Sequence, residues 1–226
     1  MSAMATRNRR FLHDNSLSLV VFGAFLLLWF GQSVAGHRTF NEDQRSHGSP
    51  AIGYGEYLTT GHFGEATFEN WESEFLQMGS YILLTVWLRQ RGSAESKSLD
   101  GGDDVDEDPQ DHRDDAGVPW PVRRGGIALA LYRNSLSAAF LTLFVLSWVS
   151  HGVTGAREYS SEQVEHGQPR VTAVEYMRSS QFWSESLQNW QSEFLAVGAI
   201  VVMSIFLRQQ GSPESKPVHE ATSETG

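Results

Sequence analysis

The feature that most constrains this chain is an internal repeat. When the sequence is aligned with itself at an offset of 119 residues, the two halves match in one ungapped register from Leu12 to Ser98. The matching segments include N-S-L-S, N-W-x-S-E-F-L and E-S-K, which begin in the first half at Asn15, Asn70 and Glu95. Two copies of one sequence unit are expected to fold as two copies of one structural unit. The fold expected for one copy is therefore expected for the other.

Each copy begins with a long apolar segment. Residues 17–35 and residues 136–155 contain no Asp, Glu, Lys or Arg. At about 1.5 Å per residue, a helix of either length covers the hydrocarbon core of a bilayer, which is about 30 Å thick. We therefore expect both segments to span a membrane.

The second apolar segment of each copy is shorter. The uncharged runs 75–88 and 194–207 have a length that is also typical of re-entrant or interfacial helices. Extending each helix back to the preceding Asn gives about 19 residues, enough to cross a bilayer. The extension also places a tryptophan of each copy at a membrane interface, which indole rings favour. We expect the two shorter spans at about 70–88 and 189–207.

Basic residues gather on one side of these four spans. They are Arg7, Arg9, Arg10, Arg89, Arg91, Lys97, Arg113, Arg123, Arg124, Arg133, Arg208 and Lys216. By the positive-inside rule, both termini and the segment between the copies are cytoplasmic, and loops 36–70 and 155–189 lie outside. The two copies then have the same orientation and are related by a pseudo-two-fold axis along the membrane normal.

The chain divides into five regions on this basis. They are a cytoplasmic N-terminus 1–11, a first hairpin repeat 12–98, a linker 99–122, a second hairpin repeat 123–217 and a tail 218–226. The linker carries most of the net charge of −10 and few apolar residues, so we expect it and the tail to be disordered. This acidic balance argues against nucleic-acid binding, which requires a basic face. The absence of cysteine excludes disulfides and thiolate sites.

The N-terminus has an alternative interpretation. Arginines, an apolar run and the tripeptide S-V-A at 33–35 resemble a cleavable signal peptide. The repeat argues against this, because segment 136–155 matches segment 17–35 in register and lies too deep in the chain to be a signal. We favour a retained first span.

Six polar residues at the outer ends of the spans are the candidate site residues. They are Arg38, Asn70, Glu74, Arg157, Asn189 and Glu193. Each of these glutamates lies one residue before an apolar run, with the asparagine four residues earlier on the same helical face. Ionisable groups at the edge of a span often mark function, so a transport or catalytic carboxylate is one interpretation. We favour a structural clamp, in which Arg38 pairs with Glu74 and Arg157 with Glu193.

Other repeated polar residues are assigned to helix ends. Asn15 and Asn134 open the long spans, and we expect their side chains to cap the helix N-termini. Gly92 and Gly211 follow the short spans, and we expect them in the left-handed conformation directly after a helix C-terminus.

The histidines show no metal-ligand spacing. His47 and His166 each precede a glycine after a polar stretch with helical propensity, a pattern that predicts the end of a helix. His151 and its counterpart Gln32 lie near the outer ends of the long spans, and we expect His151 to hydrogen-bond a neighbour or face interfacial water. No paired histidines or carboxylate set stand at ligand spacing, so we expect no metal.

The repeated motifs also resemble a known family. N-S-L-S before a span, N-W-x-S-E-F into the next and R-Q-x-G-S-x-E-S-K after it are similar to an uncharacterised family of small bacterial membrane proteins with a domain of unknown function. The resemblance covers both repeats. It implies helical hairpins and residence in the bacterial inner membrane, and it carries over neither an activity nor catalytic residues.

The sequence thus predicts an all-α, multi-pass membrane protein with four transmembrane helices from two tandem two-helix repeats in the same orientation. Its partners are the lipid bilayer and either further copies of itself or other membrane proteins. Without a Ser-His-Asp set or a phosphate-binding loop, we expect no enzyme, no catalytic residue and no cofactor. We favour a structural or interaction role. The alternatives are a small transporter or channel component, and an envelope assembly factor or enzyme.

Overall fold

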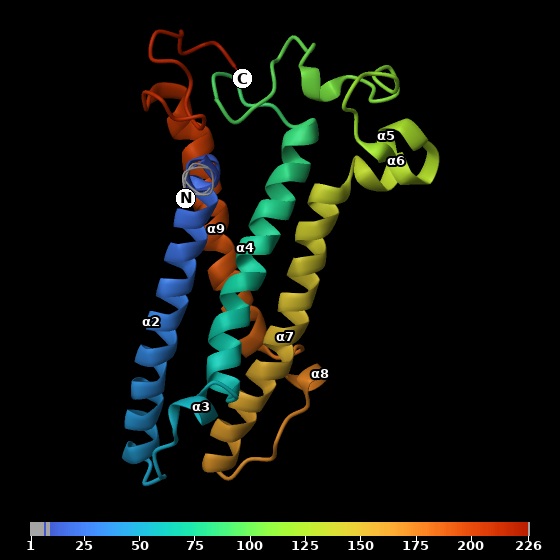
Figure 1. Cartoon of the computed structure of the whole chain (residues 1–226). Helices are drawn as coiled ribbons and strands as arrows, with labels where there is room; N and C mark the ends of the chain where they lie inside the picture. Colours follow the sequence, from blue (N-terminus) through green and yellow to red (C-terminus); the bar gives the residue numbers. More distant parts are fainter. Residues whose placement is uncertain (1–6, 8–9, 226) are drawn as a thin grey trace. The chain divides into compact units, whose positions relative to one another are not determined.

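The computed structural model describes residue 7 and residues 10–225, and every regular element in this part is helical. The predicted all-α class is therefore confirmed for the described residues. The elements are α2 (Ser16–Ser46), α3 (Tyr54–Tyr57), α4 (Gly61–Trp87), the 3-10 turn η1 (Asp104–Asp106), α5 (Trp120–Arg124), α6 (Gly126–Tyr132), α7 (Ser135–Glu165), α8 (Ala173–Tyr176) and α9 (Ser180–Phe206) (Figure 1). Most of the expected N-terminal segment 1–11, including Arg9, lies outside the described residues, as does Gly226.

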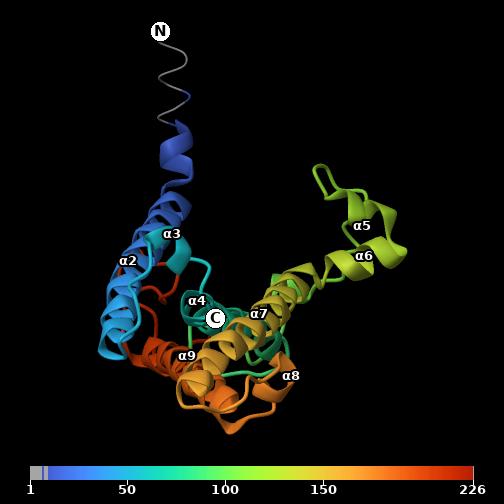
Figure 2. The same cartoon turned by 90° about the horizontal axis from the view of Figure 1, so that it is seen from below.

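The chain forms two compact units, Met1–Gly64 and Glu65–Gly226. The first contains α2, α3 and the first turn of α4. The second contains the rest of α4 and everything that follows it. In this second unit, α4, α7 and α9 lie side by side (Figures 1 and 2).

The helix boundaries have the same spacing as the sequence repeat. Both ends of α7 lie 119 residues after the ends of α2, and the same holds for α8 with α3 and for α9 with α4. The long helices continue beyond the predicted spans because no helix breaker intervenes. They stop at the predicted histidine–glycine pairs, where Gly48 has φ +75° and Gly167 has φ +73°. The predicted helix ends at these pairs are confirmed.

The predicted N-caps are wrong. Asn15 and Asn134 occupy the N-cap positions of α2 and α7, but neither side chain accepts a backbone N–H there. Each amide instead donates backwards, from Asn15 to the Phe11 carbonyl at 2.8 Å and from Asn134 to the Ala130 carbonyl at 2.9 Å. A helical turn precedes each asparagine, and its carbonyls take up the amides.

The glycines after the short spans do have the predicted left-handed conformation, with φ +80° at Gly92 and +84° at Gly211. They do not directly follow a helix, because α4 ends at Trp87 and α9 at Phe206. They belong instead to a tight turn. In each copy a serine hydroxyl, that of Ser96 or of Ser215, accepts a backbone N–H from six residues earlier at 2.9 Å. This turn accounts for the repeated R-Q-x-G-S-x-E-S-K segment.

In the first unit, α2 is joined to the segment after it by a side-chain bracket. The Asn41 amide oxygen accepts the Ile52 N–H at 2.8 Å, and its nitrogen donates to the Ile52 carbonyl at 3.0 Å. His37 Nε2 also lies 2.8 Å from that carbonyl. The bracket satisfies partly buried backbone groups outside regular structure and holds α3, whose Tyr57 is buried, against α2.

In the second unit, a corresponding bracket joins α7 to the segment before α8. The Ser160 hydroxyl donates to the Val171 carbonyl and accepts the Val171 N–H, both at 3.0 Å. Beside it, Tyr176 and Phe182 form a fully buried aromatic core with Ala156, and the Trp148 ring packs edge-on against Phe182. This core holds α8 and the start of α9 against α7.

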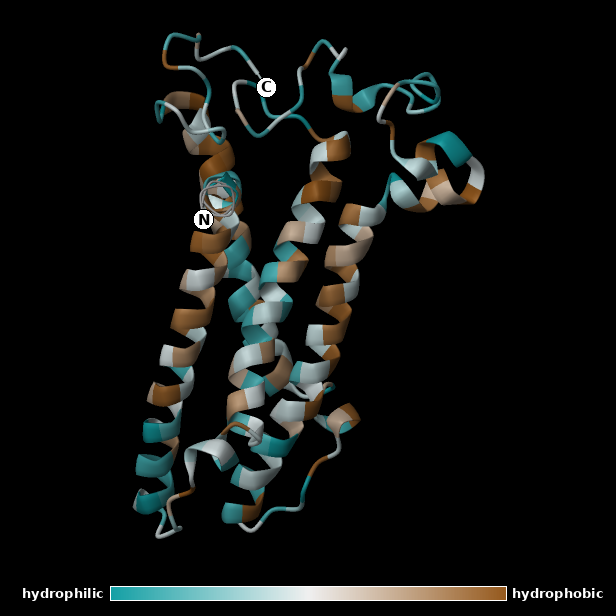
Figure 3. Ribbon diagram, in the orientation of Figure 1, coloured by the Kyte–Doolittle hydropathy of each residue, from teal (hydrophilic) through white to brown (hydrophobic). Residues whose placement is uncertain are grey.

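Among the described residues, three helices are long and apolar enough to cross a membrane, judged by length and composition: α2, α7 and α9. The prediction of four such helices is therefore corrected to three. Helix α4 is long enough but too polar to be counted as a membrane-crossing helix, because its first half carries Glu65, Glu69, Glu72 and Glu74. Figure 3 shows the contrast with α2, which is hydrophobic in its first half and hydrophilic only in its last turns.

The expected disordered linker contains some local structure. The turn η1 brings Asp106 to the basic end of the first copy, where its carboxylate lies 2.5 Å from Lys97 Nζ and 3.9 Å from an Arg89 nitrogen. Elsewhere residues 99–119 form turns and irregular segments. The disorder of segment 99–122 stays a prediction.

Because α7 and α8 pack closely at Gly155, a larger residue at this position is expected to destabilise the protein. A Cβ at Gly155 would lie 2.5 Å from the buried Tyr176 ring and 2.7 Å from a Glu65 oxygen. We expect Gly155→Ala to destabilise the protein by about 1–3 kcal/mol through overpacking. The measurement is thermal unfolding in detergent, followed by circular dichroism. The matched control is Gly198→Ala in α9, where nothing lies within 4 Å of the added carbon. Equal losses from both variants would contradict the close packing of Tyr176 on α7.

Candidate functional site: a buried carboxylate–histidine cluster

Three helices bring ionisable side chains together in the interior of the second unit. His151 comes from the middle of α7, Glu72 from α4 and Glu185 from the second turn of α9. The side chains of His151 and Glu72 have no exposed surface, and that of Glu185 is 20% exposed. Charged groups are rarely buried unless they are paired, so the contacts of this cluster decide its chemistry.

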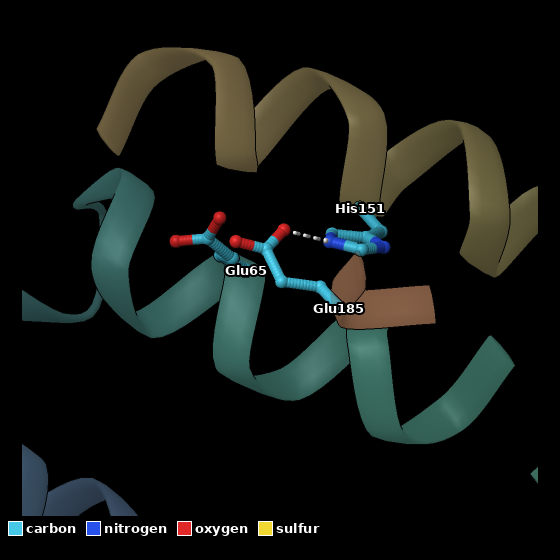
Figure 4. Close-up of side chains that lie close together, drawn as sticks. All are labelled: Glu65, His151 and Glu185. Carbon is cyan, nitrogen blue, oxygen red and sulfur yellow. Dashed lines mark ion pairs between the residues drawn. The ribbon is translucent and has the colours of Figure 1, made fainter. Parts of the chain in front are cut away.

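His151 lies between two carboxylates. Its Nδ1 is 3.0 Å from Glu72 Oε2, a hydrogen bond in which the imidazole N–H donates. Its Nε2 faces Glu185 Oε2 at 3.5 Å (Figure 4). At this separation Nε2 has no hydrogen-bond partner among the described residues, although the ring is buried. The prediction that His151 hydrogen-bonds a neighbour is confirmed at Nδ1.

Glu72 is held by donors from two helices. While Oε2 accepts from His151, Oε1 accepts from the Ser186 hydroxyl at 2.7 Å and from the Trp190 indole N–H at 3.2 Å. Three donors offset the loss of hydration that burial imposes on a carboxylate. They also fix the plane of the carboxylate, and with it the orientation of the imidazole.

The Tyr176 hydroxyl lies between the carboxylates of Glu65 and Glu185. It is 2.8 Å from Glu65 Oε1 and makes a short hydrogen bond with Glu185 Oε2. Because a hydroxyl has one proton, it donates to only one of the two carboxyl groups at a time. The other oxygen of Glu185 accepts from the Gln181 amide at 2.5 Å.

Burial raises the pKa values of Glu65 and Tyr176. Glu65, which precedes the apolar part of α4, has its pKa raised to about 7, mainly by burial and further by Glu185, against the lowering effect of the Tyr176 hydrogen bond. Burial and the neighbouring carboxylates also raise the pKa of Tyr176, which therefore stays a hydrogen-bond donor. Glu65 thus changes its protonation state near neutral pH.

The cluster has the composition of a cation site. Ligand atoms of Glu65, His151 and Glu185 all lie within 4.8 Å of one another, and Figure 4 shows the Glu185 carboxylate between the other two groups. With Glu72, three carboxyl groups surround one imidazole. A negative excess in a buried place favours a bound proton or metal cation.

None of the six residues singled out from the sequence belongs to this cluster, and Arg38 lies in the other unit. Asn189 donates to the Glu69 carboxylate, and the Glu193 carbonyl accepts from the Gln77 amide at 3.4 Å. Asn70 and Glu74 are exposed, and the Asn70 amide bonds its own helix at Ala66. Asn189 is therefore the one of the six that bonds a partly buried carboxylate, that of Glu69, next to the cluster.

The predicted clamps have different outcomes. Within the second unit, Arg157 forms no ion pair with Glu193. Arg157 follows His151 by six residues, which places it about 120° round α7 from the buried face, and it is exposed. Arg38 and Glu74 belong to the two separate units, so their pairing stays a prediction.

Sequence reasoning missed most of the cluster because its members are mismatches between the two copies. The pairs, with the residue of the cluster first, are Glu65 with Ser184, Glu72 with Gln191, His151 with Gln32, and Glu185 with Ala66, and the neighbouring Glu69 pairs with Gln188. The candidate residues named from the sequence are positions at which the two copies match. Local spacing gave no signal either, because His151 and Glu72 are 79 residues apart in sequence. A comparison of the copies for charged residues without a charged counterpart would have found all five.

Two glutamates on one turn of α4 allow a direct test of the cluster. Glu72 is buried with three donors, whereas Glu74 is exposed. We expect Glu72→Ala to cost about 3–5 kcal/mol, because it leaves His151 buried without its partner. We expect Glu74→Ala to stay within about 0.5 kcal/mol of the parent. Unfolding in detergent measures both, and a tolerant Glu72 together with a sensitive Glu74 would show that α4 is rotated from the orientation described.

Comparisons with known proteins place the chain in a family without assigning an activity. No curated protein and no solved structure matches it. A family model described as a domain of unknown function, DUF6766, matches residues 8–226. The match includes α4, α7 and α9 and therefore the whole carboxylate–histidine cluster. The chain belongs to the DUF6766 family.

Proposed function

We propose that this chain is a multi-pass membrane protein that binds cations at the carboxylate–histidine cluster and moves protons across the bilayer, as a small transporter or channel component. The observation that carries the proposal is the fully buried contact of His151 with Glu72 in the middle of α7. Helix α7 is long and apolar enough to span a membrane. Ionisable residues within such helices are costly, and they typically mark ion pathways and proton relays.

The surface of the second unit supports a lipid environment. Large apolar side chains on α7 and α9 are exposed, among them Leu146 at 59%, Leu195 at 74% and Phe206 at 69%. In water such a surface favours association or aggregation. In a bilayer the same side chains face lipid tails. A bacterial inner membrane, with both termini and the linker cytoplasmic, fits the distribution of basic residues.

We include α4 as a fourth crossing, over about residues 70–88. Its composition argues against a solitary span, but Glu72 is enclosed by α7 and α9 and receives three donors. Charged residues inside membrane proteins face the helix bundle in this way. With α4 included, each copy is a two-helix hairpin, and the two copies have the same orientation.

The cluster has the connectivity that a proton relay needs. Imidazole accepts a proton at one ring nitrogen and releases one from the other. In this chain the two nitrogens of His151 face different carboxylates, Glu72 and Glu185. From Glu185 the path continues through the Tyr176 hydroxyl to Glu65, which is partly exposed. Proton transfer would thus run from Glu72 and His151 through Glu185 and Tyr176 to Glu65, which is in contact with solvent.

A structural role was favoured from the sequence because no chemical group was seen near the middle of a span. His151 and Glu72 lie near the outer ends of the predicted spans 136–155 and 70–88, but they are fully buried and place an ionisable pair inside the helix bundle. A purely structural cluster remains the outcome to be tested against. No observation specifically favours an enzyme or an envelope assembly factor. A homo-oligomer would supply a wider pore than one chain of this size.

Topology is the first test of the proposal. A reporter active only in the cytoplasm and one active only outside are fused after Gly48, Asp104, Gly167 and Gly226. We expect outside signals at Gly48 and Gly167 and cytoplasmic signals at Asp104 and Gly226, because each copy crosses the bilayer twice. An outside signal at Asp104 would show that α4 does not cross, which would overturn the four-span arrangement.

Proton movement is the second test. The purified chain is reconstituted in liposomes with an internal pH dye, and a potassium–valinomycin potential drives protons inward. We expect faster acidification than in empty liposomes, and a rate lower by about tenfold or more for His151→Gln. The double variant Glu74→Gln/Glu193→Gln should keep the parental rate, because neither residue lies in the cluster. Tight vesicles with full incorporation and no acidification would refute transport and favour a structural cluster.

A further inference from the structure

We propose that Glu65, His151 and Glu185 form a binding site for one divalent first-row transition-metal ion of the Zn²⁺ type. The inference deepens the proposed function, since it names a second cation for the same cluster. The three ligands come from α4, α7 and α9, and their ligand atoms lie within 4.8 Å of one another. A bound ion would therefore connect α4, α7 and α9.

The imidazole nitrogen that faces Glu185 without a hydrogen bond is the first support. His151 Nε2 is buried, has no hydrogen-bond partner among the described residues, and points at the Glu185 carboxylate 3.5 Å away. Leaving a buried polar atom unsatisfied costs free energy. Two ligands of a tetrahedral Zn²⁺ ion, each at about 2.0–2.1 Å from the metal, are about 3.4 Å apart. The Nε2–Oε2 distance already has this value, so an ion fits between them.

The other side of the ring is the second support. Histidines that bind metals commonly donate their second ring N–H to a carboxylate, which fixes the tautomer and the ring orientation. The Nδ1 of His151 makes this bond with Glu72 at 3.0 Å. Glu72 is itself immobilised by Ser186 and Trp190. The imidazole therefore directs the lone pair of Nε2 at the two remaining carboxylates.

Tyr176 is the third support, because it holds those two carboxylates together. Its hydroxyl lies between Glu65 and Glu185 and cannot donate to both at once. A divalent ion satisfies both carboxylates and balances their two charges. Glu65 would move closer to Nε2 on binding, while the Glu185 and His151 positions need little change.

The ligand set selects the class of metal. One imidazole and two carboxylates suit Zn²⁺, Fe²⁺ or Mn²⁺, whereas Ca²⁺ and Mg²⁺ prefer sites made entirely of oxygen ligands. The chain has no cysteine to favour a softer ion. Three protein ligands leave one coordination position open, as in catalytic and transport sites rather than in closed structural ones. The 20% exposure of Glu185 places that position on the accessible side of the cluster.

The test uses the full chain purified in detergent, freed of metal with EDTA and then desalted. Titration with Zn²⁺ is followed by calorimetry, and the retained metal is counted by mass spectrometry after a second desalting. We expect one ion per chain, with no competition from Mg²⁺ in excess. His151→Gln and Glu185→Gln should each lose the retained ion. Glu72→Gln should keep one site but bind about 10–100-fold more weakly.

Two controls make the outcome decisive. His166→Gln and Glu193→Gln lie outside the cluster and should bind Zn²⁺ as the parent does. Because cluster variants can fail to fold, X-ray absorption of the Zn²⁺-loaded parent protein gives an independent result. We expect one imidazole among nitrogen and oxygen neighbours at about 2.0–2.1 Å. Absence of a retained ion in the parent, a spectrum without imidazole, or unchanged binding by folded His151→Gln would overturn the site.

The metal site and proton transport can be refuted independently of one another. Zinc binding without proton movement would leave the metal site standing and refute transport. Proton movement that depends on His151 in a chain that binds no zinc would refute the metal site and leave the proposed function intact.

Discussion

The contact between Glu72 and His151 is the interaction on which the second unit depends. It joins α4 to α7 where neither side chain reaches solvent, and Ser186 and Trp190 extend it to α9. A buried carboxylate or imidazole alone would be strongly destabilising. Together, and with their remaining oxygens satisfied, they become a fixed point around which three helices are oriented. The aromatic core of Tyr176 and Phe182 then packs directly beside the His151 ring.

The same contact explains why α4 differs from the other long helices. Its acidic first half makes it too polar to qualify as a membrane-crossing helix by composition. That composition serves an interior position, because Glu65, Glu69 and Glu72 all meet partners from the second copy. Helices α7 and α9 expose large apolar side chains such as Leu146, Leu195 and Phe206, while His151 and Ser186 are buried. Three of the four glutamates in the first half of α4 thus serve the helix interface, while Glu74 is exposed.

The two copies have the same helix boundaries but different ionisable side chains. Shared features are the helix boundaries, the side-chain bracket after the long helix, and the buried tyrosines Tyr57 and Tyr176. The ionisable groups of the cluster each occur in one copy only, with Gln, Ser or Ala in the other. The two copies thereby provide similar scaffolds, and the residues at which they differ place charge at one site. Function is expected where the copies differ.

Sequence reasoning alone yields the helical class, the repeat, the helix ends at the histidine–glycine pairs and the apolar helices α2, α7 and α9. These features of the fold depend on composition and periodicity within a few helical turns of sequence. It did not determine the site. The residues chosen at the span edges, Glu74 and Glu193 among them, repeat in both copies, whereas the cluster joins Glu72, His151 and Glu185 across intervals of 34 to 113 residues. Only the packing of α4, α7 and α9 decided that these three side chains share one buried volume, because burial and charge pairing are set by neighbours that are distant in sequence.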